Sequence, residues 1–120
     1  MNVLVVDGAN VVGSVPDGWW KDRAGAARRL HTRLGEQDLP YDVIELVLEG
    51  QAKAGVPEGE ESGVVTVHAP GEGDDEIVHR CRHHTVLGHA VALATADRGL
   101  IDRVAGFGVE IVGPRSVRGR

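Results

Sequence analysis

The stretch NVLVVDGAN at residues 2–10 decides the fold, because an apolar run ends there directly in an acidic turn. Val3–Val6 does not alternate between apolar and polar residues, which is typical of a parallel strand covered on both faces. Four further runs are mostly of the same kind, and they lie at Val43–Leu48, Val64–Val67, Ala90–Ala94 and Val109–Val112. We therefore expect a mainly parallel, five-stranded sheet.

Between these runs, apolar residues recur at helical spacing. The three predicted helices are Asp22–Gln37, Asp74–Leu87 and Arg98–Ala105. Strands that alternate with helices predict an α/β protein with a three-layer α/β/α arrangement. Residues 1–120 are expected to form a single domain, since the length suits one compact unit. Glu49–Gly63 is rich in glycine and acidic residues, and it is predicted to be a mobile loop at the edge of the sheet.

Composition limits the class of protein. The single cysteine, Cys81, excludes an intramolecular disulfide framework. No apolar stretch is long enough for a signal peptide or a membrane span, so a cytoplasmic protein is expected. The net charge of −5 is unevenly spread, because residues 42–76 hold ten acids and one base while residues 77–120 hold three acids and seven arginines. Two interpretations stay open: solvated surfaces of opposite sign, or an acidic metal pocket beside an arginine surface for phosphates.

Acidic residues follow the predicted strands at the edge where open parallel sheets bind ligands. Asp7 ends the first strand, Asp74 and Asp75 open the helix after the third, and Asp97 follows the fourth. Each has a purely structural alternative. Asp7 could belong to a tight turn, Asp74 and Asp75 could be acids that stabilise the first turn of a helix, and Asp97 could be a helix N-cap. Their joint occurrence favours a cation-binding site, because clustered carboxylates repel one another unless a cation lies between them. Oxygen ligands indicate Mg²⁺ or Mn²⁺.

Four motifs together carry a resemblance to a known family. They are VVDGAN at 5–10, GDDEI at 73–77, TADRGL at 95–100 and GVEIVGP at 108–114. The first three resemble the DG-x-N, paired-acid and T-x-D motifs of the NYN domain, a branch of the PIN-like superfamily. The fourth resembles the last strand of the YacP-like bacterial ribonuclease subgroup.

The resemblance implies a PIN-like fold with a flavodoxin-like order of five parallel strands, and divalent-metal-dependent cleavage of RNA. It implies that Asp7, Asp97 and one or both of Asp74 and Asp75 bind the metal, and that Asn10 orients a ligand or water. A further acid near the last motif is common in such sites, and Asp102 is the candidate for it here. The expected function is therefore an RNA endonuclease in which the metal activates water for attack on a phosphodiester.

The arginines Arg98, Arg103, Arg115 and Arg118 are candidates for binding the flanking phosphates of RNA. Two other functions stay open: an inactive NYN-like module that binds RNA or a protein, and a metal-dependent nucleotide phosphohydrolase. The size of the chain and its edge loop are compatible with a homodimer, although no interface can be read from the sequence.

Two further clusters have structural interpretations that we prefer. His79, Cys81, His83, His84 and His89 include a Cys–His pair at helical spacing, but no second pair at zinc spacing exists elsewhere in the chain. The adjacent Trp19 and Trp20 suit a hydrophobic dock for their loop better than a platform for stacking bases, the role that exposed aromatics have in single-strand binders.

Overall fold

The computed structural model describes residues 1–119 and contains a six-stranded sheet in the order β3-β4-β2-β1-β5-β6. The strands are β1 (Asn2–Asp7), β2 (Val43–Leu48), β3 (Gly59–Glu61), β4 (Val64–His68), β5 (Ala90–Ala94) and β6 (Glu110–Val112). The α-helices are α1 (Gly8–Gly13), α2 (Arg23–Glu36), α3 (Gly73–Val86), α4 (Arg98–Val104) and α5 (Pro114–Arg118). Short 3₁₀ turns are η1 (Trp19–Lys21), η2 (Gly50–Gly55) and η3 (Ala105–Phe107). All pairings are parallel except that of β3 with β4.

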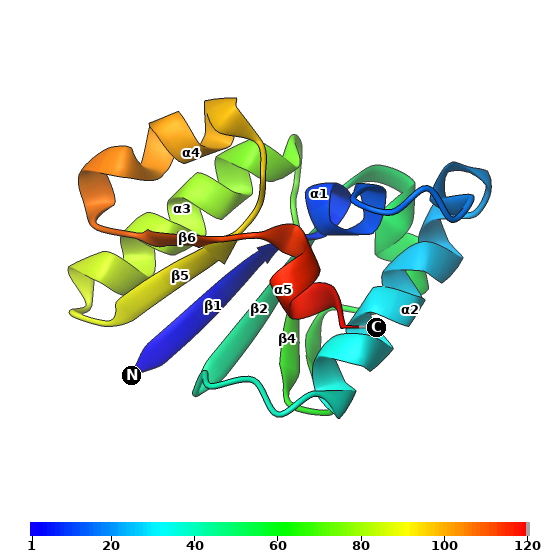
Figure 1. Ribbon diagram of the computed structural model, residues 1–120, viewed down its shortest axis with the longest axis horizontal. Helices are drawn as coiled ribbons and strands as arrows, with labels where there is room; N and C mark the ends of the chain where they lie inside the picture. Colours follow the sequence, from blue (N-terminus) through cyan, green and yellow to red (C-terminus); the bar gives the residue numbers. More distant parts are fainter. Residues whose placement is uncertain (120) are drawn as a thin grey trace.

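Helices cover both faces of the sheet, which confirms the predicted three-layer α/β/α fold (Figure 1). Side chains on successive residues of a strand point to opposite faces. In β1, Leu4 and Val6 belong to the core on the side of α1, α2 and α5. Val3 and Val5 belong to the core on the side of α3 and α4. The apolar run is continuous because both faces of this strand are buried.

The strand order differs from the flavodoxin-like one that was expected. Numbered in chain order, the five parallel strands run 3-2-1-4-5 across the sheet, whereas the flavodoxin-like order is 2-1-3-4-5. The physical reason lies in β2, which pairs along one edge with β1 and along the other with β4. An apolar run shows that a strand is buried, but it does not show which strands are its neighbours.

The segment Glu49–Gly63 lies at the edge of the sheet as predicted, but it contains regular secondary structure, so its assignment as a loop was wrong. Gly50–Gly55 forms η2 and Gly59–Glu61 forms β3, the sixth strand of the sheet. Val56 between them is 1% exposed and belongs to the α2 side of the core. Arg28 of α2 donates from Nε to the carbonyl of Gly55 and forms an ion pair with Glu61. These contacts fix a segment whose polar sequence resembles that of a loop.

A buried ion pair joins the centre of the sheet to α3. Glu45 of β2 accepts from Arg80 Nε at 3.0 Å and from Arg80 Nη2 at 2.6 Å, and His84 Nε2 lies 3.0 Å from its Oε1. Burial alone would raise the pKa of Glu45, but the hydrogen bonds and charge of Arg80 hold it below its usual value. Burial raises the pKa of the neighbouring Cys81 thiol to about 12, which disfavours the thiolate that zinc requires.

Within residues 1–119, no helix combines the length and the apolar character needed to cross a membrane.

Candidate active site

The sheet reverses its strand order between β1 and β5, and this is where an open α/β sheet binds ligands. Asp7, the last residue of β1, is only 5% exposed. Its Oδ2 accepts a hydrogen bond from the hydroxyl of Thr95, which follows β5, at 2.8 Å. Its Oδ1 accepts from the backbone N–H of Asn10 at 3.3 Å, which caps α1. Both carboxylate oxygens of Asp7 are therefore oriented by the protein.

Two more hydrogen bonds join the loops after β1 and β5. Asn10 Oδ1 accepts from the backbone N–H of Ala96 at 2.9 Å, and Thr95 Oγ1 accepts from the backbone N–H of Asp97 at 3.1 Å. Asp97 in turn caps α4, because its Oδ1 accepts from the backbone N–H of Leu100. The DG-x-N and T-x-D motifs thus form one connected unit, in which the carbonyl oxygen of Asn10 is used to hold the second loop in place.

A third motif reaches the same place from α3. Asp74, in the first turn of α3, is half-buried. Partial burial raises the pKa of Asp74, and the negative charges of Asp97 and Glu49 raise it further. Burial likewise raises the pKa of Asp7, and so do the charges of Asp74 and Asp97, although the hydrogen bonds from Thr95 and Asn10 lower it. The three aspartates are therefore electrostatic neighbours.

Glu49 is a fourth carboxylate here, and the sequence interpretation missed it. It follows β2 directly, and its Oε2 accepts from the backbone N–H of Gly73 at 2.8 Å. A Cβ on Gly73 would lie 3.0 Å from the Glu49 carboxyl carbon, so the glycine permits this close approach. We call Asp7, Glu49, Asp74 and Asp97 the acidic edge. Glu49 carries the same signal as Asp7, an acid at the carboxyl end of a buried strand.

The chemistry of the acidic edge suits a hard cation, because its donors are carboxylate oxygens and because burial, together with the neighbouring negative charges, raises the pKa values of Asp7 and Asp74. Across residues 1–119, however, no three His, Cys, Asp or Glu side chains stand close enough together to hold a metal ion. The acidic edge therefore gathers suitable donors without presenting a closed set of ligands.

The other predicted metal ligands lie apart from these contacts. The side chain of Asp75 is 69% exposed and forms an ion pair with Arg103 at 2.9 Å. Asp74 and Asp75 thus have different surroundings, although they are adjacent in the sequence. Asp102, on α4, is exposed to solvent.

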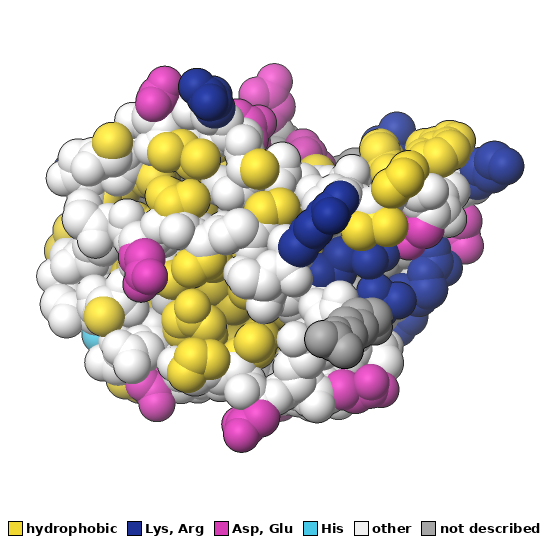
Figure 2. All heavy atoms as spheres, viewed as in Figure 1, with side chains coloured by type: hydrophobic (Ala, Val, Ile, Leu, Met, Phe, Trp, Pro, Cys, Tyr) yellow, Lys and Arg dark blue, Asp and Glu magenta, His cyan; other side chains and the backbone are white. Residues whose placement is uncertain are grey.

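Three of the four predicted phosphate-binding arginines have partners within the chain. Arg103 pairs with Asp75, Arg118 with Asp17, and Arg115 donates to the carbonyl of Ser14. Arg98 is exposed at the start of α4, next to Asp97. Figure 2 shows that Lys and Arg side chains gather over α2 and α5. The positive charge visible on this face therefore lies largely over these two helices, and not only over the C-terminal segment.

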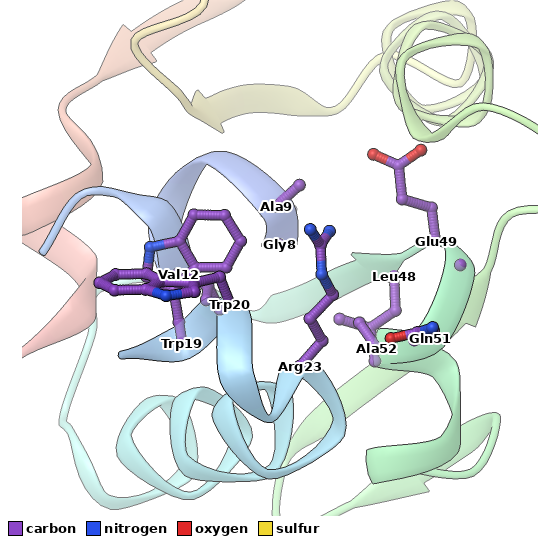
Figure 3. Close-up of a pocket in the computed structure, with 11 residues that line it drawn as sticks. Gly8, Ala9, Val12, Trp19, Trp20, Arg23, Leu48, Glu49, Gln51 and Ala52 are labelled. Atoms are coloured by element: carbon purple, nitrogen blue, oxygen red, sulfur yellow. The ribbon is translucent and has the colours of Figure 1, made fainter. Parts of the chain in front are cut away.

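A pocket of about 750 Å³ adjoins the acidic edge (Figure 3). Its walls come from α1, η1, the start of α2, the end of β2 and the start of η2, and they include Gly8, Ala9, Val12, Trp19, Trp20, Arg23, Leu48 and Glu49. Trp19 packs edge-on against Trp20 and lies beneath the guanidinium of Arg23. Trp19 is half-buried whereas Trp20 is 50% exposed, so the expected hydrophobic dock describes Trp19 better than Trp20.

The sheet order and its covering helices define a three-layer α/β/α domain (Figure 1). Among solved structures, the chain is similar to that of a mutant of Rae1 (YacP) from Bacillus subtilis, with a TM-score of 0.72 and 20% identity over 98% of this chain and 72% of that chain. This likeness supports the YacP-like fold that the motifs predicted. No protein-family profile and no curated protein matches the sequence.

Proposed function

We propose that this protein is a divalent-metal-dependent RNA endonuclease of the NYN type. One observation carries the proposal: three motifs, far apart in the sequence, bring Asp7, Asp74 and Asp97 to the switch point of the sheet. There, burial and the charges of Asp74 and Asp97 raise the pKa of Asp7, and burial and the charge of Asp97 raise the pKa of Asp74. A fold does not gather carboxylates at such a cost without a use for their charge. The YacP-like fold supports the same class of enzyme.

Asp7, Asp74 and Asp97 would hold Mg²⁺ or Mn²⁺. Such an ion, when bound, makes a water molecule more acidic and stabilises charge on phosphoryl oxygens. We assign the α3 ligand to Asp74, because its pKa responds to Asp97 while Asp75 is occupied by Arg103. Thr95 and Asn10 are positioning residues, since Thr95 fixes the Asp7 carboxylate and Asn10 fixes the loop that carries Asp97.

Substrate phosphates would approach the acidic edge beside Arg98, which is exposed next to Asp97. Arg103, Arg115 and Arg118 would first have to leave their present partners, so they are weaker candidates. Contacts of this kind contribute affinity that depends on salt and carries little information about sequence.

The decisive experiment incubates the protein with end-labelled single-stranded RNA, duplex RNA and nucleoside triphosphates, with Mn²⁺ or with EDTA. We expect Mn²⁺-dependent cleavage within RNA strands, reduced about 100-fold or more in Asp7→Asn and in Asp97→Asn, because each substitution removes a negatively charged ligand. Asp102→Asn is the matched control and should cleave as the wild type does, because Asp102 is exposed outside the acidic edge.

Three outcomes would contradict the proposal in different ways. Cleavage that survives in both Asp7→Asn and Asp97→Asn would remove the acidic edge from the mechanism. Hydrolysis of triphosphates without cleavage of RNA would indicate a nucleotide phosphohydrolase. Binding of RNA without turnover of any substrate would indicate a binding module.

A further inference from the structure

The pocket beside the acidic edge has features that packing alone does not explain. We call it the tryptophan–arginine pocket, after Trp19, Trp20 and Arg23, which line it (Figure 3). Trp20 leaves half of its surface in contact with solvent. Burying a tryptophan ring is strongly favourable, so a ring left open at the mouth of a pocket is available to a ligand.

The arrangement of these side chains suits a flat, electron-rich ring. The rings of Trp19 and Trp20 are 5.8 Å apart and lie at 89°, so they form two walls of a corner instead of stacking on each other. The Arg23 guanidinium lies 5.2 Å from the centre of the Trp19 ring. Among the ion pairs of residues 1–119, none involves Arg23, so its charge remains available. Aromatic faces and arginine planes are the two surfaces on which proteins stack nucleobases.

The pocket is continuous with the acidic edge through both the backbone and a side chain. Gly8 and Ala9, which line it, directly follow Asp7. Glu49 lines it too, and the same carboxylate binds the N–H of Gly73, the residue before Asp74. A ligand in the pocket therefore lies next to the carboxylates that would act on a phosphate.

The charge and size of this region fit a nucleotide within a strand. Figure 2 shows Lys and Arg side chains on both sides of the apolar surface near α2. Such positive charge attracts a phosphate backbone from a distance. A volume of about 750 Å³ falls within the range of small-ligand sites, so there is room for one base with its sugar.

We propose that the tryptophan–arginine pocket binds an unpaired nucleobase of single-stranded RNA and thereby places the adjoining phosphate at the acidic edge. This inference rests on the proposed nuclease function and gives it a substrate preference. A base within a duplex is stacked on its own strand and paired with the opposite strand, so it cannot enter the tryptophan–arginine pocket. Single-stranded RNA is therefore preferred over duplex RNA.

The binding experiment is done in EDTA, so that cleavage cannot interfere. It measures the Kd of fluorescein-labelled single-stranded RNA by anisotropy, and compares the same strand with one abasic position and the same sequence as a duplex. We expect Trp20→Ala to weaken binding about tenfold, since one stacked base contributes on this scale, and Trp20→Phe to restore most of the affinity. Arg23→Gln should weaken binding several-fold and reduce its dependence on salt.

Two matched variants serve as controls. Leu87→Ala removes another exposed apolar side chain, one outside the pocket, and Arg82→Gln removes an exposed arginine from α3, away from the positive surface near α2. Both should bind RNA as the wild type does. Thermal melting of every variant shows whether the protein is folded, and because Trp20→Phe keeps an aromatic ring, a misfolded Trp20→Ala does not leave the proposal without a test.

The outcomes separate the pocket from the nuclease. Equal Kd values for the wild type, Trp20→Ala and Arg23→Gln would overturn the base-binding pocket, even if the wild type cleaves RNA in Mn²⁺. Equal affinity for the single strand and the duplex would overturn it as well. Loss of affinity in Trp20→Ala and its return in Trp20→Phe, in a protein that never cleaves RNA, would support base binding by the pocket and contradict the proposed nuclease activity.

Discussion

The carboxyl group of Asp7 is almost fully buried beside two other negative charges, and its pKa is raised for that reason. A carboxyl whose pKa is higher in the folded state than in the unfolded state lowers stability once the pH rises through the folded pKa. Asn has nearly the same shape and no charge. We therefore expect Asp7→Asn to raise the melting temperature of the metal-free protein near neutral pH by about 2–5 °C.

The difference in melting temperature between Asp7→Asn and the wild type should depend on pH, and thermal melting at several pH values measures it. The gain in Asp7→Asn should be complete above the folded pKa of Asp7 and should disappear below its ordinary value of 3.8, where the wild-type carboxyl is protonated in both states. Asp102→Asn, which removes one negative charge from an exposed site, should leave the melting temperature unchanged. A lower melting temperature in Asp7→Asn would mean that the Thr95 and Asn10 hydrogen bonds outweigh the repulsion.

Single residues also show how much of the candidate site could be predicted from the sequence. It pointed to Asp7 and Asp97 because each follows a buried strand, and the structure connects them through Thr95. It did not separate Asp74 from Asp75, because neighbouring residues point in directions about 100° apart on a helix and the phase of α3 depends on its packing. Glu49 was assigned to a loop, although the rule that selected Asp7 applies to it equally.

Among the elements, those with an apolar pattern could be predicted, including the short α4 and β6, whereas α1 and β3 could not. The predicted strands Val43–Leu48 and Ala90–Ala94 have the observed bounds, and the helix expected at Asp22–Gln37 is observed at Arg23–Glu36. In contrast, α1 is only six residues long and was not predicted, because its sequence, GANVVG, is too short to show a helical period. The sixth strand, β3, is fully exposed, so it has no apolar residues to reveal it.

The short helix α1 depends on a glycine where it leaves β1. A Cβ on Gly8 would lie 2.5 Å from the carbonyl oxygen of Val47 and 2.9 Å from Leu48 Cδ2, so the start of α1 could not rest against β2. On Gly13, at the other end of the same helix, a Cβ would meet only Trp19 at an ordinary 3.7 Å. We expect Gly8→Ala to cost about 1–3 kcal/mol of unfolding free energy, while Gly13→Ala has little effect or stabilises slightly.

Urea unfolding followed by circular dichroism measures both variants. Since Gly8 adjoins Asp7, Gly8→Ala should also reduce Mn²⁺-dependent cleavage of RNA, whereas Gly13→Ala should not. Equal stability of the two variants would show that β2 can shift to accept a Cβ at position 8 with little loss of unfolding free energy.

At the scale of the whole molecule, the order of the strands creates the site, and this is the part that the sequence could not supply. The expected flavodoxin-like order would separate β1 from the strand that carries Asp97, because another strand would lie between them. In the observed order, β1 pairs directly with β5, so Asp7 and Thr95 meet at the switch point. Pairing partners are set by contacts between distant segments, which local patterns do not encode.

Because the acidic edge is assembled from β1, β2, α3 and the loop after β5, it exists only in the folded chain, and a cation bound there must stabilise the entire fold. At a Mn²⁺ concentration of about 100 times its Kd, this linkage contributes about 2.7 kcal/mol, or roughly 10 °C in melting temperature for a protein of this size. We expect Asp7→Asn to lose most of that shift although it melts higher than the wild type without metal, and Asp102→Asn to keep it. These opposite effects of one substitution distinguish a cation site from a general loss of stability. A wild-type melting temperature that does not change with Mn²⁺ would show that the acidic edge does not bind this cation.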